Sequence, residues 1–299
     1  YVNMGKMIEF VLHNGVDPRT GKLMGLQTGD PREFKNIEEF KDALKKQILH
    51  HYKLVTTGYN IMQGIHMLRY PVIFASMVTK GCVESGKSVQ QGGAKYSTAG
   101  LFITGAANMA DSIAAIEKCV YEDKDITMDE LIDALDHNFE GQERMRQLLL
   151  NKPEKFGNDE AHVDGIYREM MHFIADEVQQ WPDARGGHYS FNVHSQTVNV
   201  SHGAVCGATP DGRLSGEPFC DNAIILNHLF LNGRDVFLRI PAICICADSS
   251  QSELRLPLLQ VVSSNKYFSV GVQSPTEINA PRGRTLSGRQ WFCADRNGV

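Results

Sequence analysis

Residues 81 to 88 read GCVESGKS, a stretch whose residue types and spacing match a phosphate-binding loop. The pattern G-x-x-x-x-G-K-[ST] surrounds nucleotide phosphates with backbone N–H groups, a lysine and a hydroxyl, here Lys87 and Ser88. Such a loop joins a buried strand to a helix whose first free N–H groups face the anion. The apolar run YPVIFASMV, just before the loop, has the composition of that strand.

The segment after Ser88 is a poor match for the helix of a phosphate loop. It reads VQQGGAKYSTAG, and Gly92 and Gly93 each cost about 1 kcal/mol relative to alanine in a helix interior. A second apolar run, MMHFIADE, imitates a strand ending in a magnesium-binding aspartate, but fits better as the buried face of a helix. A nucleotide-binding module that uses Lys87 and Ser88 is therefore the alternative interpretation and not the first one.

Apolar residues at helical spacing dominate the first 180 residues. The spacing predicts helices over residues 4–12, 37–70, 110–123, 126–139 and 163–181. Gly15 can end the first helix in the left-handed conformation, and Thr127 with Glu130 forms a capping box at the fourth. The run GGHYSFNVHSQTVNV instead alternates polar with aromatic or β-branched residues, which predicts a strand. A structural turn follows at TPDG and leaves Arg213 free to pair with a carboxylate.

Composition excludes several classes of protein. The chain has 299 residues, of which 42% are hydrophobic and 22% charged, and its formal net charge is −5, so nucleic acid is not an expected partner. There is no apolar run of about 18 residues and no signal-peptide pattern at the start, which predicts a cytoplasmic protein without a membrane partner. Seven cysteines without C-x-x-C spacing, and histidines without paired spacing, predict reduced thiols and no metal site.

Several ordered segments together resemble one family. They read GCVESGKSVQQGGAKY, ANMADSIAAIEKCVYEDKDITMDELIDAL, KFGNDEAHVDGIYREM, RGGHYSFNVHSQTVNVSHGAVCGATPDGR and SGEP. In this order they resemble the pyruvate formate-lyase-like glycyl radical enzymes, in particular the branch that contains glycerol and other diol dehydratases. The resemblance covers residues 1 to 222 and implies an α/β fold, namely part of a ten-stranded α/β barrel whose interior hosts a radical reaction.

The family implies a specific chemistry. A glycine on a C-terminal loop stores an unpaired electron, a barrel cysteine receives it as a thiyl radical and abstracts hydrogen from a small polar substrate, and a glutamate acts as base or acid. The reaction eliminates water from a diol or cleaves another C–O, C–N or C–C bond. The resemblance also implies that no cofactor is bound, that a radical S-adenosylmethionine activating enzyme installs the radical under anaerobic conditions, and that the parent enzyme is a homodimer.

Candidates for these catalytic roles are few. Cys82 has Glu84 two residues on, as the thiyl cysteine and its base would require. The family's Cys-x-Glu loop, however, precedes the first predicted helix, so this register places it upstream of Tyr1 and leaves Cys82 as a buried or helix-end thiol. The run RTLSGRQWF offers Gly288 for the radical, although Arg289 replaces an aromatic residue and an ordinary loop glycine is the other interpretation. We therefore expect a fragment that is inactive by itself.

The predicted strand supplies candidates for the substrate pocket. These are Asn192, His194 and Gln196, which are two residues apart and therefore lie on the same face of an extended chain. In the matching segment of diol dehydratases a tyrosine near the position of His194 reaches the substrate, so an imidazole here changes the expected contact. It could donate to a hydroxyl, bind a carboxylate or transfer a proton, or it could simply bond to a neighbouring backbone carbonyl.

The last part of the chain, residues 223 to 299, has a different character. Residues 1 to 222 hold 22 Lys and Arg against 30 Asp and Glu, whereas residues 223 to 299 hold 8 against 5, with Lys266 the only lysine. The resemblance ends at the same point, which predicts either a diverged C-terminal segment or one translated out of frame. The run LRLPLLQVVSSNKYFSVGVQS still has the composition of strands. A non-catalytic scaffold remains a further alternative function.

Overall fold

The computed structural model describes residues 1–158, 160–193, 197–220, 259–264 and 267–272. The chain divides into two compact units, Tyr1–Ile245 and Cys246–Val299. No helix in the described ranges is long and apolar enough to cross a membrane.

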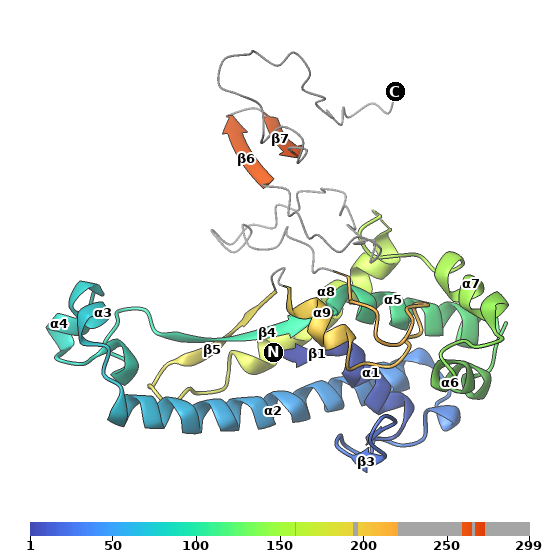
Figure 1. Ribbon diagram of the computed structural model, residues 1–299, viewed down its shortest axis with the longest axis horizontal. Helices are drawn as coiled ribbons and strands as arrows, with labels where there is room; N and C mark the ends of the chain where they lie inside the picture. The colour runs from blue at the N-terminus through green and yellow to red at the C-terminus, as the bar shows by residue number, and fades with distance from the viewer. Residues whose placement is uncertain (159, 194–196, 221–258, 265–266, 273–299) are drawn as a thin grey trace. The chain divides into compact units, whose positions relative to one another are not determined.

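Three parallel strands organise the first unit (Figure 1). They are β1 (Val2–Asn3), β4 (Thr98–Thr104) and β5 (His188–Asn192), and β4 lies between the other two. β1 pairs with the end of β4, matching Val2 with Ile103, while β5 pairs along β4 from Thr98 to Phe102. Because parallel strands require crossover connections, the segments between them carry the helices that cover the sheet.

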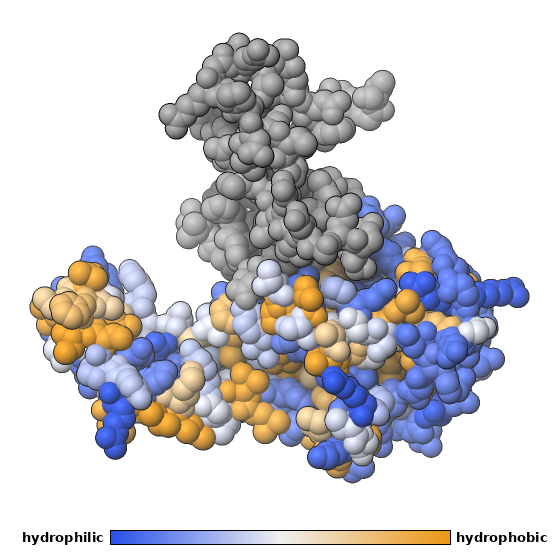
Figure 2. Space-filling view, viewed as in Figure 1, coloured by the Kyte–Doolittle hydropathy of each residue, from blue (hydrophilic) through white to orange (hydrophobic). Residues whose placement is uncertain are grey.

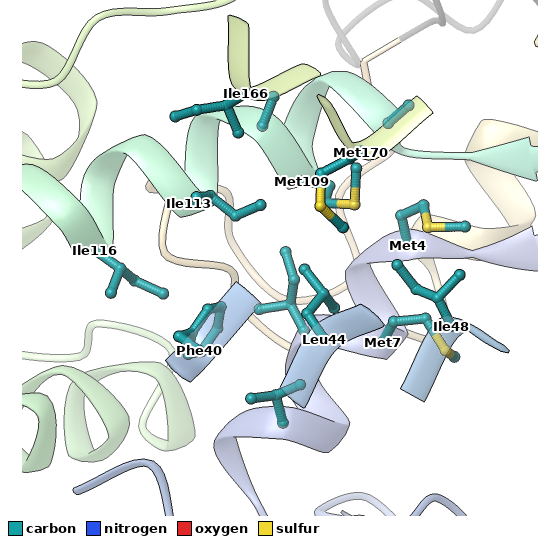
Figure 3. Close-up of a cluster of buried hydrophobic side chains, with 14 of the residues drawn as sticks. Met4, Met7, Phe40, Leu44, Ile48, Met109, Ile113, Ile116, Ile166 and Met170 are labelled. Carbon is teal, nitrogen blue, oxygen red and sulfur yellow. The ribbon is translucent and has the colours of Figure 1, made fainter. Parts of the chain in front are cut away.

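Four helices build the hydrophobic core against one face of this sheet. They are α1 (Met4–Leu12), α2 (Ile37–Arg69), α5 (Ala106–Ile116) and α8 (Ala161–Val178). Figure 3 shows their side chains meeting, with Met4, Leu44, Met109 and Met170 among those that interdigitate. All four side chains are fully buried, and each such side chain contributes about 1.5–3 kcal/mol through removal of apolar surface from water. The predicted helical faces are therefore the faces that form the core.

Most of the predicted helices are confirmed, and their ends follow the predicted signals. Gly15 follows α1 with φ +86°, the left-handed conformation predicted for it. Asn36, which was not predicted as a cap, precedes α2, and its side chain accepts a hydrogen bond from the N–H of Glu39. The capping box is present at α6 (Met128–Asp136), where Glu130 N–H donates to Thr127 Oγ1 at 3.2 Å. Further helical segments are α7 (Glu143–Asn151), two 3₁₀ turns (Pro31–Glu33 and Val89–Gln91) and a π-helical segment (Glu117–Glu122) that continues α5.

Three local predictions are wrong or incomplete. The run proposed as a strand before GCVESGKS is the short helix α3 (Ile73–Val78), followed by α4 (Cys82–Ser85). The alternating pattern after residue 186 forms β5, but its continuation is the helix α9 (Val198–Gly203). The central strand β4 was not predicted, because its sequence TAGLFIT has two small residues at its start and no clear alternation.

The smaller antiparallel elements complete the described residues. The loop after α1 contains the ladder of β2 (Val16–Asp17) and β3 (Lys22–Leu23). In the second unit, β6 (Leu259–Ser264) and β7 (Tyr267–Val272) form an antiparallel hairpin. The strand-like composition noted for residues 254 to 274 is thus matched by two strands.

Candidate functional site

The carboxyl ends of the three parallel strands lie together at one edge of the sheet (Figure 1). β1 ends at Asn3 and runs directly into α1, while β4 ends at Thr104 and enters α5 through Gly105 at φ +76°. Loops beyond the carboxyl ends of parallel strands commonly carry the functional groups of α/β proteins. The side chains at this edge are therefore the first place to look for a site.

Alternation along the strands divides the sheet into an apolar face and a second face that we call the polar face. Ala99, Leu101 and Ile103 of β4 are buried in the helical core, together with Tyr189 of β5. Their neighbours point the other way. The polar face is made by the cross-strand pairs Asn3 with Thr104, Gly100 with Ser190, and Phe102 with Asn192.

Asn192, one of the predicted pocket residues, lies on this polar face. Its Nδ2 donates to the backbone oxygen of Ser190 at 3.3 Å and to Ser190 Oγ at 3.2 Å. A Cβ built on Gly100 would lie 3.1 Å from Asn192 Nδ2, tighter than an ordinary van der Waals contact. Glycine at position 100 thus gives the Asn192 amide room to lie across β4. The other two predicted pocket residues, His194 and Gln196, lie outside the described residues, as does Gly288.

Two polar atoms at this edge have no hydrogen-bond partner among the described residues. They are Thr104 Oγ1, on a residue only 1% exposed, and His202 Nδ1. Asn3 connects them, because its Nδ2 donates to the backbone oxygen of His202 at 3.0 Å and its Cα pairs in register with Thr104. Burial lowers the pKa of His202, so its imidazole is neutral near pH 7, with one ring nitrogen that donates a hydrogen bond and one that accepts. Sequence reasoning missed both residues, since neither stands in a recognisable motif.

The TPDG turn folds over the same edge as a rigid cap. Arg213 Nη1 donates to the backbone oxygens of Leu214 at 2.9 Å and Glu217 at 2.6 Å, and its guanidinium lies 4.5 Å from the centre of the Phe219 ring. Asn108 of α5 donates to Asp211 at 2.6 Å. The turn is structural, as predicted, but Arg213 pairs with carbonyl groups and not with a carboxylate. The reason is that its donors converge on the turn's own backbone.

A buried charged cluster lies under this cap. Lys6 Nζ is 2.6 Å from Glu9 Oε2 and 2.8 Å from Asp17 Oδ1, and Cys206 Sγ donates to Glu9 Oε2 at 3.6 Å. Burial acts against both charges, but hydrogen bonds between the partners outweigh it, so the pKa of Lys6 is raised and that of Asp17 is lowered. Burial, followed by the charge of Glu9, raises the pKa of the Cys206 thiol to about 12. Cys206 is therefore a neutral thiol and a poor nucleophile.

Cys82 and Glu84 do not belong to this edge. Figure 1 shows α4 at the opposite end of the first unit from the carboxyl ends of the strands. Cys82 is buried at the start of α4, whereas Glu84 is exposed and accepts a hydrogen bond from the N–H of Gly81 at 3.0 Å. Its carboxylate thus caps its own helix. The thiyl and base roles for this pair stay predictions that the geometry does not favour.

The phosphate-loop pattern also lacks its supporting elements. A helix, α3, lies where the strand is needed. The segment directly after Ser88 is not a full helix but the 3₁₀ turn Val89–Gln91, which ends at Gly92 with φ +76°. The N–H groups of a full helix are therefore not directed at Lys87. Among the described residues there is also no group of three or more His, Cys, Asp or Glu side chains that could hold a metal ion.

Comparison with known proteins gives the geometry a context. Residues 1–203 match the family model described as Pyruvate formate lyase-like. Over 218 residues the chain is 37% identical to the trans-4-hydroxy-L-proline dehydratase of Clostridioides difficile, covering 73% of this chain and 28% of that protein. It is 31% identical to the (2S)-3-sulfopropanediol dehydratase of Klebsiella oxytoca over 223 residues, covering 74% and 27%.

Solved structures show the same relationship. The hydroxyproline dehydratase of Clostridioides difficile with its substrate bound superposes with a TM-score of 0.71 at 35% identity, over 74% of this chain and 29% of that one. The B12-independent glycerol dehydratase of Clostridium butyricum gives 0.70 at 34% identity, over 74% and 28%. The predicted fold, part of a glycyl radical enzyme barrel, is confirmed. The chain spans less than a third of the length of these relatives.

Proposed function

The chain belongs to the pyruvate formate lyase-like family, and from this membership we propose that it forms part of the barrel of a glycyl radical dehydratase or lyase. The observation that carries the proposal is the family match over residues 1–203, which include all three parallel strands, together with 37% identity to a dehydratase over 218 residues. The relatives are dehydratases and lyases of small polar substrates, such as hydroxyproline and sulfopropanediol. The substrate of this chain is proposed to be of the same class.

Within that enzyme the polar face is the proposed wall of the substrate pocket. Asn192 supplies an amide, Thr104 a hydroxyl without a partner among the described residues, and Phe102 an apolar surface between them. Donors fixed by a rigid sheet can hold a substrate hydroxyl in one orientation at no cost in reorganisation. His194 and Gln196 are proposed as further contacts on the same strand segment.

The radical chemistry itself requires groups beyond this wall. A glycyl radical, installed by a radical S-adenosylmethionine activating enzyme, supplies hydrogen abstraction through a cysteine thiyl radical. No Cys-x-Glu loop is proposed within these residues, and Gly288 is the proposed but poorly matching radical glycine. We propose that these 299 residues are not competent alone, and that the active enzyme is an anaerobic, cytoplasmic homodimer.

Activity of the enzyme made with the flanking coding sequence tests this function. The protein is expressed anaerobically with its activating enzyme and offered glycerol, propane-1,2-diol and trans-4-hydroxy-L-proline, and loss of substrate is followed. We expect one of them to be consumed, and Asn192→Ala to lower kcat/KM by about tenfold or more through loss of one substrate hydrogen bond, with no change in melting temperature. Leu23→Ala, at an exposed position in β3, is the matched control.

Two results would contradict the proposal. One is micromolar ATP binding that Lys87→Ala abolishes, which would support the nucleotide-binding module instead. The other is a complete gene that encodes no Cys-x-Glu loop, which would support a scaffold. Reading the same DNA in its other two frames after residue 222 decides whether the tail is diverged or out of frame, since only the second case recovers family-like sequence.

A further inference from the structure

The exposed apolar side chains of the first unit are concentrated in one region. Thirteen of the nineteen large apolar side chains that are exposed among the described residues fall between Leu54 and Tyr96. These residues form the C-terminal half of α2, α3, α4 and the segment leading to β4, which we call the apolar lobe. Figure 2 shows the corresponding hydrophobic surface at the end of the first unit that carries α3 and α4. Scattered exposed apolar residues are normal, but their concentration in one region is not.

On α2 the exposed apolar residues form a stripe. Leu54, Ile61, Ile65 and Leu68 are separated by seven, four and three residues, so they lie on one face of the helix, and each is more than half exposed. Gly58 and Gly64 are interspersed with them, and a Cβ built on either would meet no atom within 4 Å. An apolar stripe at helical spacing, lined by residues without side chains, is the surface that another helix packs against.

A pocket elsewhere in the apolar lobe has the size of one large side chain. It has a volume of about 240 Å³, lies between α3 and α4, and is lined by Ile73, Met77, Val83 and Cys82, with Lys87 and Ser88 among its polar lining residues. Phe74, on the same short helix, is 86% exposed. The lobe therefore offers both a stripe for a helix and an apolar socket next to a cation.

The charge of the lobe is opposite to that of the rest of the chain. Residues 53 to 95 contain five Lys and Arg and a single acid, Glu84, whereas the remaining residues contain 25 Lys and Arg against 34 acids. All five cations are exposed, and none of them makes an ion pair in the described part of the chain. The carboxylate of Glu84 is occupied by the N–H of Gly81. A partner that complements this surface must be acidic as well as apolar.

The apolar area is large enough for a stable interface. At about 60–120 Å² of apolar surface per Val, Leu, Ile or Phe side chain, thirteen mostly exposed side chains amount to on the order of 800 Å². That is about the area of one side of a standard protein interface, about 800 Å². Water-exposed apolar surface of this extent is costly, and the chain spans less than a third of its relatives' length.

We propose that the apolar lobe is the docking surface for an acidic amphipathic helix supplied by the part of the enzyme that these 299 residues do not include. Its apolar face covers the stripe on α2, one large apolar side chain fills the pocket between α3 and α4, and its carboxylates meet Lys80, Lys87 and Lys95. This inference rests on the proposed function in taking the occupant from the same enzyme. Its chemistry, acidic and apolar at helical spacing, comes from the lobe alone.

A second copy of the chain is a poorer occupant. The helix α6 is strongly acidic, since it contains Asp129, Glu130, Asp133 and Asp136 and neither Lys nor Arg. None of the large exposed apolar side chains of the described residues lies between residues 97 and 193, the range that includes α6. The helix α6 offers negative charge without an exposed apolar face, so a second copy would pair with the cations of the lobe and leave the apolar stripe on α2 in water.

Binding of designed peptides to the 299-residue chain tests the chemistry of the occupant. The probes are three labelled 20-residue helical peptides. The first has leucine at i, i+4 and i+7 and glutamate at the other positions. The second keeps these leucines but replaces every glutamate with lysine, and the third keeps the glutamates but replaces every leucine with alanine. Fluorescence anisotropy should show the first binding at least about tenfold more tightly than the others, and more weakly as salt rises. Ile65→Asp and Phe74→Asp should each reduce its affinity by about tenfold, and Lys87→Glu several-fold.

Controls keep the result specific to the lobe. Leu23→Asp introduces the same charge at an exposed residue outside the lobe and should leave peptide binding unchanged. Circular dichroism and melting temperature of each variant should match the parent chain, since the substituted side chains already face water. Equal binding of the three peptides, or a concentration-dependent dimer that Ile65→Asp abolishes, would overturn the proposal, the second result because it identifies the occupant as a copy of the chain.

Thiol labelling identifies the source of the occupant. Val78, 86% exposed, is replaced by cysteine and its reaction with a maleimide is followed by mass spectrometry of the labelled peptide. Val78→Cys should react at least about tenfold more slowly in the enzyme made with the flanking coding sequence than in the 299-residue chain, while Leu23→Cys reacts equally in both. Equal rates at Val78→Cys, or a gene that encodes only these residues, would overturn the proposal. Neither readout depends on activity, so failure of the proposed reaction stays separate from failure of docking.

Discussion

Replacement of Gly5 by alanine should destabilise the chain, because the cap at the strand ends packs directly on the first turn of α1. A Cβ built on Gly5 lies 2.4 Å from Cζ and 2.5 Å from Cε1 of Phe219, more than 1 Å inside the usual carbon–carbon separation of about 3.5–4.0 Å. The phenyl ring of Phe219 has little room to move away from the new methyl group. It is 2% exposed, it lies over Gly105, and the Arg213 guanidinium covers it at 4.5 Å.

The expected magnitude follows from two opposing effects. Overpacking of a well-filled site costs about 1–3 kcal/mol, and complete ejection of the phenyl ring would cost about 3–5 kcal/mol. The gain in helix propensity from glycine to alanine is at most about 1 kcal/mol, and smaller in a first turn. We expect Gly5→Ala to lower the free energy of unfolding by about 1–3 kcal/mol, which corresponds to a urea midpoint lower by about 1 M.

Urea unfolding followed by far-UV circular dichroism measures this effect. Gly5→Ala combined with Phe219→Leu should recover part of the loss, because the smaller side chain makes room for the new methyl group, and the double-mutant cycle should show positive coupling. Gly58→Ala, where a Cβ meets nothing within 4 Å in the interior of α2, is the matched control and should stabilise the chain by about 0.5–1 kcal/mol. A Gly5→Ala midpoint equal to or above that of the parent chain would refute the packing of the cap on α1.

Three further predictions concern the cap of α6, the buried charges and the buried thiol. Thr127→Ala removes one half of the capping box with Glu130 and should cost about 1 kcal/mol in urea unfolding, whereas Thr127→Ser should cost almost nothing. Because the pKa of Asp17 is lower in the folded chain than in the unfolded one, its carboxylate stabilises the fold above about pH 4, and this contribution is lost as the pH falls through the folded value. Asp17→Asn should therefore lower the free energy of unfolding by about 1–3 kcal/mol at pH 7. Between about pH 5 and 3 the variant should lose less stability than the parent chain. Identical pH profiles of the two chains would contradict the role of Lys6 as the partner of Asp17. Cys206, with a thiol pKa of about 12, should resist iodoacetamide at pH 8 in the folded chain and react only at the rate of unfolding. Mass spectrometry of the peptide that contains Cys206 measures this reaction. Immediate alkylation would contradict the burial of the thiol.

The helices were predictable because each repeats a local signal. The apolar spacing of residues 4 to 12, and the reciprocal bonds of Thr127 with Glu130, depend on residues within one or two turns. The errors arose where local pattern and tertiary context disagree. The apolar run at Ile73–Val78 has strand-like composition but forms a helix with most of its side chains exposed, so no burial on both faces selects an extended chain.

The site could be predicted only in part. Asn192 was identified through family resemblance, and its strand was visible in the sequence as an alternating run. Asn3 and Thr104 were not identified, because a two-residue strand has no periodicity and its pairing with β4 joins positions about a hundred residues apart. The contact of Cys206 with Glu9, 197 residues apart, is likewise set by the fold and leaves no mark in the local sequence.

Electron paramagnetic resonance of the activated protein tests the central claim most directly. The enzyme made with the flanking coding sequence is incubated anaerobically with its activating enzyme, S-adenosylmethionine and a reductant, and the 299-residue chain is treated identically. A glycyl radical signal should appear in the former, split by the α-hydrogen and collapsing to a singlet when glycine is deuterated, and should be absent from the latter. Absence of the signal in the longer enzyme, with an activating enzyme shown to be competent on a known relative, would contradict its assignment as a glycyl radical enzyme. A signal in the 299-residue chain that Gly288→Ala removes would contradict the proposal that this part of the barrel cannot act alone.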